Sequence, residues 1–430
     1  MIAALFFSCT NPCLSPYEEG SVETVSSGPL SLTRTAYSEG MCGPAFSATA
    51  DLNEDGSSSL IVSLFGRSDG FALSNGSLIS VDLETGEREI LLSDEEGYKW
   101  PNSIEVADVD NDEDMDILVG FGFLTCQLNP FTGPCGALAW IENQGNEWKP
   151  HDIVRGENVF YHHPLFTDLD GDGIEDILTV KESYATPFGT EAGAELGWWK
   201  GLGDGAFSDE IYITDGLGSL PQLWDIDQDG DLDIISGEYF ADPYTSYVWL
   251  EQKTPPSDDN PQGDWEKHTI DDNAGPTIQI HLVDDLYGDG VLRAVASNHT
   301  NTEKSSPDPW PSELAIYTPP EDPRQPWTKE TIYDGFISAT PSTQAAPGIF
   351  TVGDADDDGD MDILISGDGD PRVVWFEQSS SGIFELHTLE PELTQAGSLQ
   401  IKNLSGDSRT EMTVSGYDDN VLFVYSKETE

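Results

Sequence analysis

Short aspartate-rich segments are the residues of this chain best suited to chemistry. The segment DLDGDGIED places carboxylates at its first, third, fifth and ninth positions, which are Asp168, Asp170, Asp172 and Asp176. In such a loop the carboxylates and the backbone carbonyl of the seventh residue can converge, and glycine at the sixth position permits a sharp turn. A ligand set made only of oxygen atoms favours a hard, large cation, so we expect Ca²⁺ rather than Mg²⁺ or a transition metal.

The same carboxylate spacing recurs along the chain, which makes an isolated acidic turn a poor explanation. Complete copies also read DVDNDEDMD from Asp108, DIDQDGDLD from Asp225 and DADDDGDMD from Asp354. Weaker copies start at Asp51, Asp285 and Asn403. EF-hands and dockerins share the first half of this pattern, but they need a glutamate at the twelfth position or a helix after the loop. Here strand-like runs such as DILV and DIIS follow, so these acidic loops are not EF-hands.

The spacing of the seven acidic loops predicts the architecture. They follow one another at about 60 residues, the length of one four-stranded blade with its turns. In the second repeat we expect strands at 103–107, 116–120, 137–143 and 147–154, because apolar runs there are bounded by Gly, Asn and Pro. A tryptophan recurs in the third strand, where packing between blades explains it best. The sequence therefore predicts an all-β, seven-bladed β-propeller with four-stranded blades.

The ends of the chain predict how the ring closes. The last repeat stops at NVLFVYSKETE, which supplies a third strand but no fourth. The segment SVETVSSGPLSL, from Ser21, precedes the first repeat and can supply the missing strand. Such pairing leaves fewer exposed sheet edges. We expect residues 1–20 to be a leader and tether and residues 21–430 to form a single propeller.

These loops and the runs after them resemble a known family, the FG-GAP or VCBS repeats, whose seven-bladed propeller also occurs in integrin alpha chains. The resemblance covers nearly the whole chain after residue 45. It implies that each calcium loop joins the first and second strands of a blade and stiffens it. By this resemblance the metal ligands are the aspartates of the four complete loops: Asp108, Asp110, Asp112 and Asp116; Asp168, Asp170, Asp172 and Asp176; Asp225, Asp227, Asp229 and Asp233; Asp354, Asp356, Asp358 and Asp362.

The three weaker loops depart from the family pattern. Ser59 replaces the last ligand in the first repeat, and Tyr287 replaces the second ligand in the fifth. In the seventh repeat, Asn403 and Ser405 replace carboxylates. The resemblance therefore leaves the occupancy of these three sites open.

The charge of the chain excludes several partners. Its formal net charge is −62, from 80 acidic and 18 basic residues. A surface so negative repels nucleic acid and anionic membrane headgroups, so we expect neither as a partner. The composition is 37% hydrophobic and includes 11 tryptophans, which suffices for a large core. We expect a folded monomer.

The N-terminus and the cysteines indicate export. The run MIAALFFS before Cys9 resembles the end of a bacterial lipoprotein leader, although no basic segment precedes it and Phe6 and Phe7 depart from the usual small residues. Lipidation at Cys9 and an ordinary cleaved secretory leader remain open, and both predict an extracellular or cell-surface location, the former as an outer-membrane lipoprotein. No later apolar run is long enough to span a membrane. Cys126 and Cys135 lie close in sequence and predict a local disulfide, and Cys13 can pair with Cys42.

The end of the propeller opposite the acidic loops is the expected ligand face. It should gather the longer loops, where functional residues usually lie over a rigid scaffold. Aromatic rings beside carboxylates and imidazoles suit a sugar, which needs an apolar surface for its face and polar groups for its hydroxyls. The candidate ligand-binding residues are Trp100, Tyr161, His162, His163, Lys181, Glu182, Glu238, Tyr239, His281 and His299.

Three classes of function remain open after the sequence. The preferred one is an exported, calcium-stabilised binding module for glycans or surface proteins. The competing one is a carbohydrate-active lyase or dehydratase in which histidines of the ligand face move protons or bind a second metal. The third is an adhesive repeat protein. No GxSxG, P-loop, HExxH or Rossmann glycine motif anchors a mechanism, so no catalytic residue is assigned.

Overall fold

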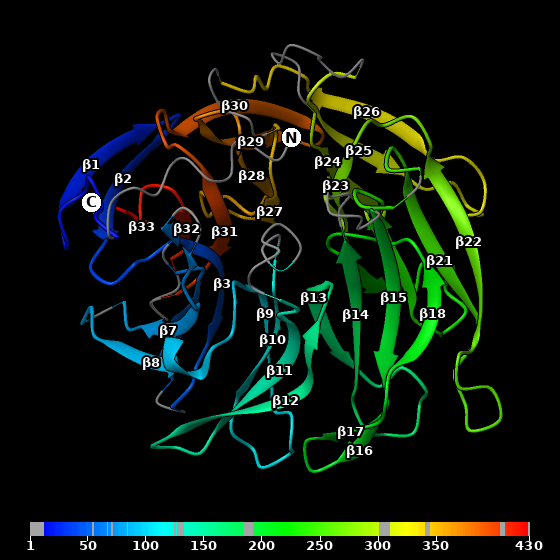
Figure 1. Ribbon diagram of the computed structural model, residues 1–430. Coiled ribbons are helices and arrows are strands. Elements are labelled where there is room, and N and C mark those ends of the chain that lie inside the picture. The colour runs from blue at the N-terminus through cyan, green and yellow to red at the C-terminus, as the bar shows by residue number, and fades with distance from the viewer. Residues whose placement is uncertain are drawn as a thin grey trace.

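The fold is a ring of β-sheets around one axis, shown in Figure 1. The computed structural model describes residues 13–53, 56–66, 68–69, 72–83, 85–123, 126, 133–183, 192–241, 243–300, 310–339, 345–404 and 409–428. Cys9 lies outside these residues. Seven antiparallel sheets form the blades, and a short 3₁₀ helix, η1 (Asp94–Glu96), precedes the second. The predicted all-β, seven-bladed propeller is confirmed.

The first six blades have four strands each, and in every one the chain runs from the innermost strand to the outermost. The first three blades are β3 (Pro44–Ala50), β4 (Ser59–Leu64), β7 (Ser77–Val81) and β8 (Arg88–Leu92); β9 (Pro101–Ala107), β10 (Asp116–Phe121), β11 (Gly136–Asn143) and β12 (Trp148–Glu157); β13 (Phe160–Thr167), β14 (Asp176–Ser183), β15 (Gly193–Trp199) and β18 (Ile211–Asp215). The next three are β19 (Gln222–Trp224), β20 (Asp233–Gly237), β21 (Tyr247–Thr254) and β22 (Asp264–Asp271); β23 (Thr277–Val283), β24 (Arg293–Asn298), β25 (Leu314–Thr318) and β26 (Thr328–Tyr333); β27 (Phe350–Gly353), β28 (Asp362–Ser366), β29 (Val373–Ser380) and β30 (Ile383–Glu390). Two small hairpins, β5 (Ser68–Asp69) with β6 (Ala72–Leu73) and β16 (Gly201–Gly203) with β17 (Ala206–Phe207), lie outside the blades.

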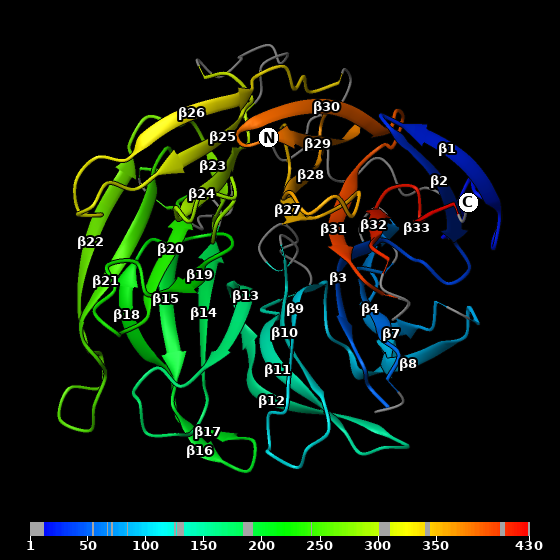
Figure 2. The same ribbon diagram turned by 180° about the vertical axis from the view of Figure 1, so that it is seen from behind.

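The seventh blade closes the ring with chain from both ends. Its inner strands are β31 (Ala396–Lys402), β32 (Glu411–Gly416) and β33 (Val421–Lys427). Strand β2 (Leu30–Tyr37) pairs with β33, and β1 (Val22–Ser27) pairs with the outer side of β2, as Figure 2 shows from behind. The predicted N-terminal closure is confirmed, with one difference. A hairpin rather than one strand is added, so this sheet has five strands.

The core lies between neighbouring blades, as the recurring tryptophans predicted. Trp249 of the fourth blade packs in one cluster with Leu282 and Ala294 of the fifth. Trp375 of the sixth blade packs with Met412 and Phe423 of the seventh. Truncating a buried aromatic residue to alanine typically costs about 3–5 kcal/mol. These interfaces therefore hold each sheet against the next.

Two disulfides join described cysteines. Cys126 pairs with Cys135, and Cys13 pairs with Cys42, in agreement with the sequence. Such bonds persist in oxidising compartments, which fits an extracellular protein. In the part of the chain that the structure describes, no helix has the length and apolar character needed to cross a bilayer.

Candidate functional site

The two ends of the propeller carry different chemistry. In each blade the acidic loop joins the first strand to the second. Because neighbouring strands are antiparallel, the turns from second to third strands and the connections between blades lie at the opposite end. The acidic loops therefore gather at one end of the ring, away from the expected ligand face.

The first aspartate of each complete loop holds the turn through both of its oxygens. The backbone N–H of Asp172 donates to Asp168 Oδ1 at 3.0 Å, and the N–H of Gly173 donates to Asp168 Oδ2 at 2.9 Å. The same two bonds recur around Asp108, Asp225 and Asp354. Hydrogen bonds within each loop therefore give all four loops the same shape.

The ninth aspartate is buried and ties the loop to the third strand. The N–H of Val109 donates to Asp116 Oδ2 at 3.0 Å, and the N–H of Asn143 donates to Asp116 Oδ1 at 2.8 Å. Equivalent bonds hold Asp176, Asp233 and Asp362. Burial raises the pKa to about 7 for Asp116, Asp233 and Asp362, and to about 6 for Asp176. A nearby cation would favour the ionised form of each.

The carboxylates of these loops lie close enough to share one cation. Oxygens of Asp108, Asp110 and Asp116 all lie within 4.8 Å of one another. The corresponding triplets are Asp168, Asp170 and Asp176 in the third blade and Asp225, Asp227 and Asp229 in the fourth. Oxygen donors at this spacing fit a hard divalent cation such as Ca²⁺.

Two loops contain residues that the sequence pattern did not single out. Glu113 occupies the sixth position of the loop from Asp108 and has a φ of 79°, a conformation that glycine adopts at lower cost. Arg293 occupies the ninth position of the loop from Asp285. Its guanidinium donates to both oxygens of Asp289 at 2.7 Å and lies 4.0 Å from the centre of the Tyr287 ring. In the fifth blade an arginine thus stands where the complete loops have a carboxylate.

At the opposite end, aromatic residues recur soon after the second strands. They are Phe65, Phe123, Tyr239, Phe240, His299 and Tyr417, in the first, second, fourth, fifth and seventh blades. Phe46, Trp100 and Phe160 lie on or directly before first strands of the first three blades. We call these nine residues the aromatic arc.

Ring contacts make the arc continuous across the blades. The ring centres of Tyr417 and Phe65 are 5.3 Å apart, and those of Phe65 and Phe123 are 5.8 Å apart. Further centre-to-centre distances are 5.4 Å for Phe123–Phe160, 5.5 Å for Phe160–Phe240, 4.8 Å for Tyr239–Phe240 and 5.4 Å for Tyr239–His299. The arc therefore runs from the seventh blade to the fifth.

The arc has a buried layer and a layer that reaches solvent. Phe65, Trp100, Phe160 and His299 are buried, whereas Phe46, Phe123, Tyr239, Phe240 and Tyr417 are partly exposed. Trp100 stacks on Phe65 at 4.8 Å and is only 4% exposed. Its φ is 42°, and its indole Nε1 is buried without a hydrogen-bond partner among the described residues. Backbone strain and an unsatisfied donor together are features that binding sites retain.

A histidine–carboxylate pair lies against the arc. His162 Nδ1 donates to Glu182 Oε2 at 2.9 Å, and the second oxygen of the buried Glu182 accepts the backbone N–H of Ser219. The imidazole contacts Phe46 and Phe123, with ring centres 6.2 and 5.2 Å away. Because Nδ1 is bonded to the carboxylate, Nε2 is the ring nitrogen that remains for another partner.

His163, next to His162 on β13, and His281 on β23 are further histidines of inner strands. Their ring centres are 6.5 Å apart. His163 Nδ1 contacts Ser103 Oγ at 3.3 Å, and His281 Nε2 donates to the carbonyl of Leu220 at 3.2 Å. Burial lowers the pKa of His163 to about 3 and that of His281 to about 4. The histidines considered for an enzyme therefore make hydrogen bonds to different partners.

The remaining candidates divide between the arc and the blades. Tyr161 is buried against Trp199, and Lys181 pairs with Glu195 at 3.0 Å, so both serve packing and charge pairing within the blades. Glu238 precedes Tyr239, but its carboxylate accepts from Lys267 Nζ at 2.8 Å. Of the predicted residues, the structure brings together Trp100, His162, Glu182, Tyr239 and His299. Six members of the arc were not among the predicted residues: Phe46, Phe65, Phe123, Phe160, Phe240 and Tyr417. Most of them follow the end of a second strand, so aligning the repeats at that point of the sequence reveals them.

Comparisons with known proteins add little to this picture. No protein-family model matches the chain, and no curated protein matches it. Solved structures that resemble it include an Agrocybe aegerita lectin, studied for specific recognition of non-reducing terminal N-acetylglucosamine, at 14% identity, 81% coverage of both chains and a TM-score of 0.47. The rhamnogalacturonan lyase YesW aligns at 14% identity, over 96% of this chain and 76% of its own, with a TM-score of 0.46.

Proposed function

We propose that the protein is an exported glycan-binding module, stabilised by Ca²⁺, whose binding surface is the aromatic arc. The observation that supports this most is the continuous set of rings at one end of the propeller, in which buried rings such as Phe65 and Phe160 connect partly exposed ones. A sugar ring stacks its apolar face on such side chains. The rigid backing lowers the entropy lost on binding.

Polar groups beside the rings can read the hydroxyls of the sugar. Trp100 Nε1 is a buried donor without a hydrogen-bond partner among the described residues, so a ligand would reach it only if the neighbouring rings shift; His162 Nδ1 is held by Glu182, and Asp368 Oδ2 lies 3.5 Å from His299 Nε2. The hydroxyls of a polyol need both hydrogen-bond donors and hydrogen-bond acceptors. The net charge of −62 repels polyanionic sugars, so neutral glycans are the expected ligands.

A glycan array with the purified chain tests this function, followed by calorimetry with the best ligand. Phe123→Ala and Tyr239→Ala should each weaken binding about five- to tenfold, since one stacked ring contributes about 1 kcal/mol. The matched control is Tyr212→Ala on β18, an exposed tyrosine outside the arc, which should bind as the wild type does. Unchanged affinity in both arc variants would refute the assignment of the surface, and capture of a surface protein in place of any glycan would refute the ligand class.

One observation supports a second candidate, a carbohydrate-active lyase or dehydratase. The His162–Glu182 pair has one feature of a general base, an imidazole whose Nδ1 is fixed by a carboxylate. Such a base would take a proton from a carbon of the sugar, a carbon–carbon double bond would form as the neighbouring carbon–oxygen bond breaks, and water would protonate the departing oxygen. Incubation with polysaccharides, followed by ultraviolet absorbance of unsaturated products, tests it. Activity in the wild type that His162→Gln abolishes, with glycan binding retained, would replace the binding module with the enzyme.

A further inference from the structure

A lysine of the third blade stands at its own acidic loop. Lys200, directly after β15, places Nζ in contact with Asp170 and 2.7 Å from Asp172 Oδ2. The side chain of Asp170 is only 5% exposed. A positive charge of the protein thus already stands between two of the four carboxylates of this loop.

In the fourth blade a basic side chain also lies at the acidic loop, but it comes from the fifth blade. Arg324, between β25 and β26 of the fifth blade, contacts Asp227 and Glu251 through the same nitrogen, Nη2. The side chain of Asp227 is 3% exposed and that of Glu251 is fully buried. One cationic atom therefore lies between an acidic loop and a glutamate of the third strand.

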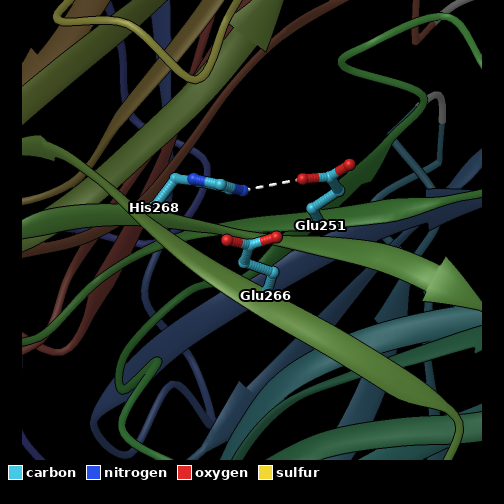
Figure 3. A group of neighbouring side chains, drawn as sticks. All are labelled: Glu251, Glu266 and His268. Carbon is cyan, nitrogen blue, oxygen red and sulfur yellow. Dashed lines mark hydrogen bonds and ion pairs between the residues drawn. The ribbon is translucent and has the colours of Figure 1, made fainter.

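That glutamate belongs to a unit repeated in three blades. Glu142, Glu251 and Glu377 stand two residues after Trp140, Trp249 and Trp375. In each blade a histidine of the fourth strand lies 2.6–2.7 Å from the glutamate and packs on the tryptophan. Figure 3 shows the histidine and the glutamate of the fourth-blade unit, in which His268 points at Glu251 with Glu266 beside them. The histidine fixes the direction of the glutamate, as outer partners of metal ligands commonly do.

The second and sixth blades have the glutamate, but in the described residues no basic side chain pairs with a ligand position of their loops. Within the described residues, no lysine or arginine pairs with Asp110 or Asp356. Lys149 reaches only Glu142, at 3.5 Å, and Lys427 pairs with Asp357, at the fourth position of its loop, which is not a ligand position. Asp110 Oδ1 is buried without a hydrogen-bond partner in the described structure. At their ligand positions these two loops therefore gather carboxylates that no lysine or arginine of the described residues neutralises.

We propose that the four complete loops divide into two kinds. The loops of the second and sixth blades bind a divalent cation, with Glu142 and Glu377 as additional ligands outside the loop. In the third and fourth blades Lys200 and Arg324 take the place of the ion permanently. The proposal rests on the Ca²⁺ binding proposed above and adds which loops use it and which residues decide.

Calorimetric titration of the chelator-treated full chain with Ca²⁺ alone tests the division at matched loop positions. Asp110→Ala and Asp356→Ala should each lose one bound ion, whereas Asp170→Ala and Asp227→Ala should lose none. Glu142→Gln and Glu377→Gln should each weaken one site about tenfold or more. The control is Glu195→Gln, a third-strand glutamate that pairs with Lys181 at the other end of its blade, and it should leave binding unchanged.

Removing the built-in cations gives the converse test. Lys200→Met and Arg324→Met should each add one Ca²⁺ site, because the carboxylates beside them lose their partner. Loss of an ion in all four aspartate variants, or unchanged stoichiometry in both the lysine and the arginine variant, would overturn the division while leaving Ca²⁺ binding intact. A wild-type chain that binds no Ca²⁺ would refute the proposed calcium stabilisation itself. Should one variant fail to fold, the other still decides.

Discussion

A buried charge pair should contribute much of the stability of the ring closure. Arg34 of β2 donates through Nη1 to Glu390 Oε1 at 2.6 Å, and Glu390 ends β30 in the sixth blade. The hydroxyl of Tyr425 on β33 donates to the same oxygen at 2.5 Å. The guanidinium also lies 4.6 Å from the ring centre of Phe423. One arginine therefore joins the closing hairpin to two blades.

The substitution Arg34→Met removes the charge and keeps most of the apolar stem. It leaves the carboxylate of Glu390, which is 3% exposed, with the Tyr425 hydroxyl as its donor but without a positive charge beside it. Breaking one side of a buried ion pair typically costs about 3–5 kcal/mol, because the other charge stays buried and unpaired. The second carboxylate at Arg34, Glu23, is 62% exposed and adds little. We expect the free energy of unfolding to fall by about 3 kcal/mol.

Equilibrium urea unfolding followed by tryptophan fluorescence measures this change. The double variant Arg34→Met/Glu390→Gln should recover most of the loss, because a neutral amide still accepts from Tyr425. Arg155→Met is the matched control, since Arg155 also lies over an aromatic ring, 4.0 Å from the centre of Tyr98, but pairs at the surface. It should cost below about 1 kcal/mol. A loss of under about 1 kcal/mol in Arg34→Met, or no recovery in the double variant, would show that the pair does not secure the closure.

Three further outcomes are expected. Chelation with EGTA should lower the melting temperature, since each occupied site adds roughly 3–4 kcal/mol when free Ca²⁺ is about 100 to 1,000 times its Kd; an unchanged melt would count against calcium. Glu113→Gly should stabilise the protein by about 1 kcal/mol, because glycine adopts a positive φ at lower cost. Gly230 occupies the same position of its loop with a φ of 102°, so Gly230→Glu should destabilise the protein. Calorimetric melting of both variants would check these effects. Burial raises the pKa of Glu105 on β9 from 4.5 to about 7, so its contribution to stability is present below about pH 4.5 and is lost as the pH rises through about 7. Glu105→Gln should therefore gain stability relative to the wild type at pH 8 but not at pH 4, as parallel urea titrations would show.

The sequence was sufficient for the architecture because each blade repeats the same local pattern. The strands expected at 103–107, 116–120, 137–143 and 147–154 correspond to β9, β10, β11 and β12, with bounds that differ by up to three residues. Apolar runs fix the strands, and the fixed period fixes the ring. The fifth strand of the seventh blade was not predicted, because pairing of β1 to β2 is a local hairpin that leaves no mark in the period.

Contacts between distant residues explain what the sequence could not reveal. Arg324 meets Glu251 across 73 residues, and nothing in its neighbourhood of Pro and Asp marks it as a partner of another blade. The aromatic arc was missed in part for a similar reason. Phe65 and Phe123 read as the ends of apolar strands, and only the ring brings them together with Tyr417.

The second strands separate the two ends of the molecule, so the proposed cation should affect stability and ligand binding differently. Strand β10 begins at Asp116 in the acidic loop and ends at Phe121, two residues before Phe123 of the arc, and all of its residues are buried. Six residues of strand span about 20 Å, and a buried strand has little freedom to bend. An ion in the loop can therefore hold the blade together without reaching the ligand. Chelation should lower the melting temperature while leaving glycan affinity unchanged at temperatures where the chelated protein stays folded. A glycan affinity that falls with Ca²⁺ removal in the folded protein would instead place the ion within the binding site, which these distances oppose.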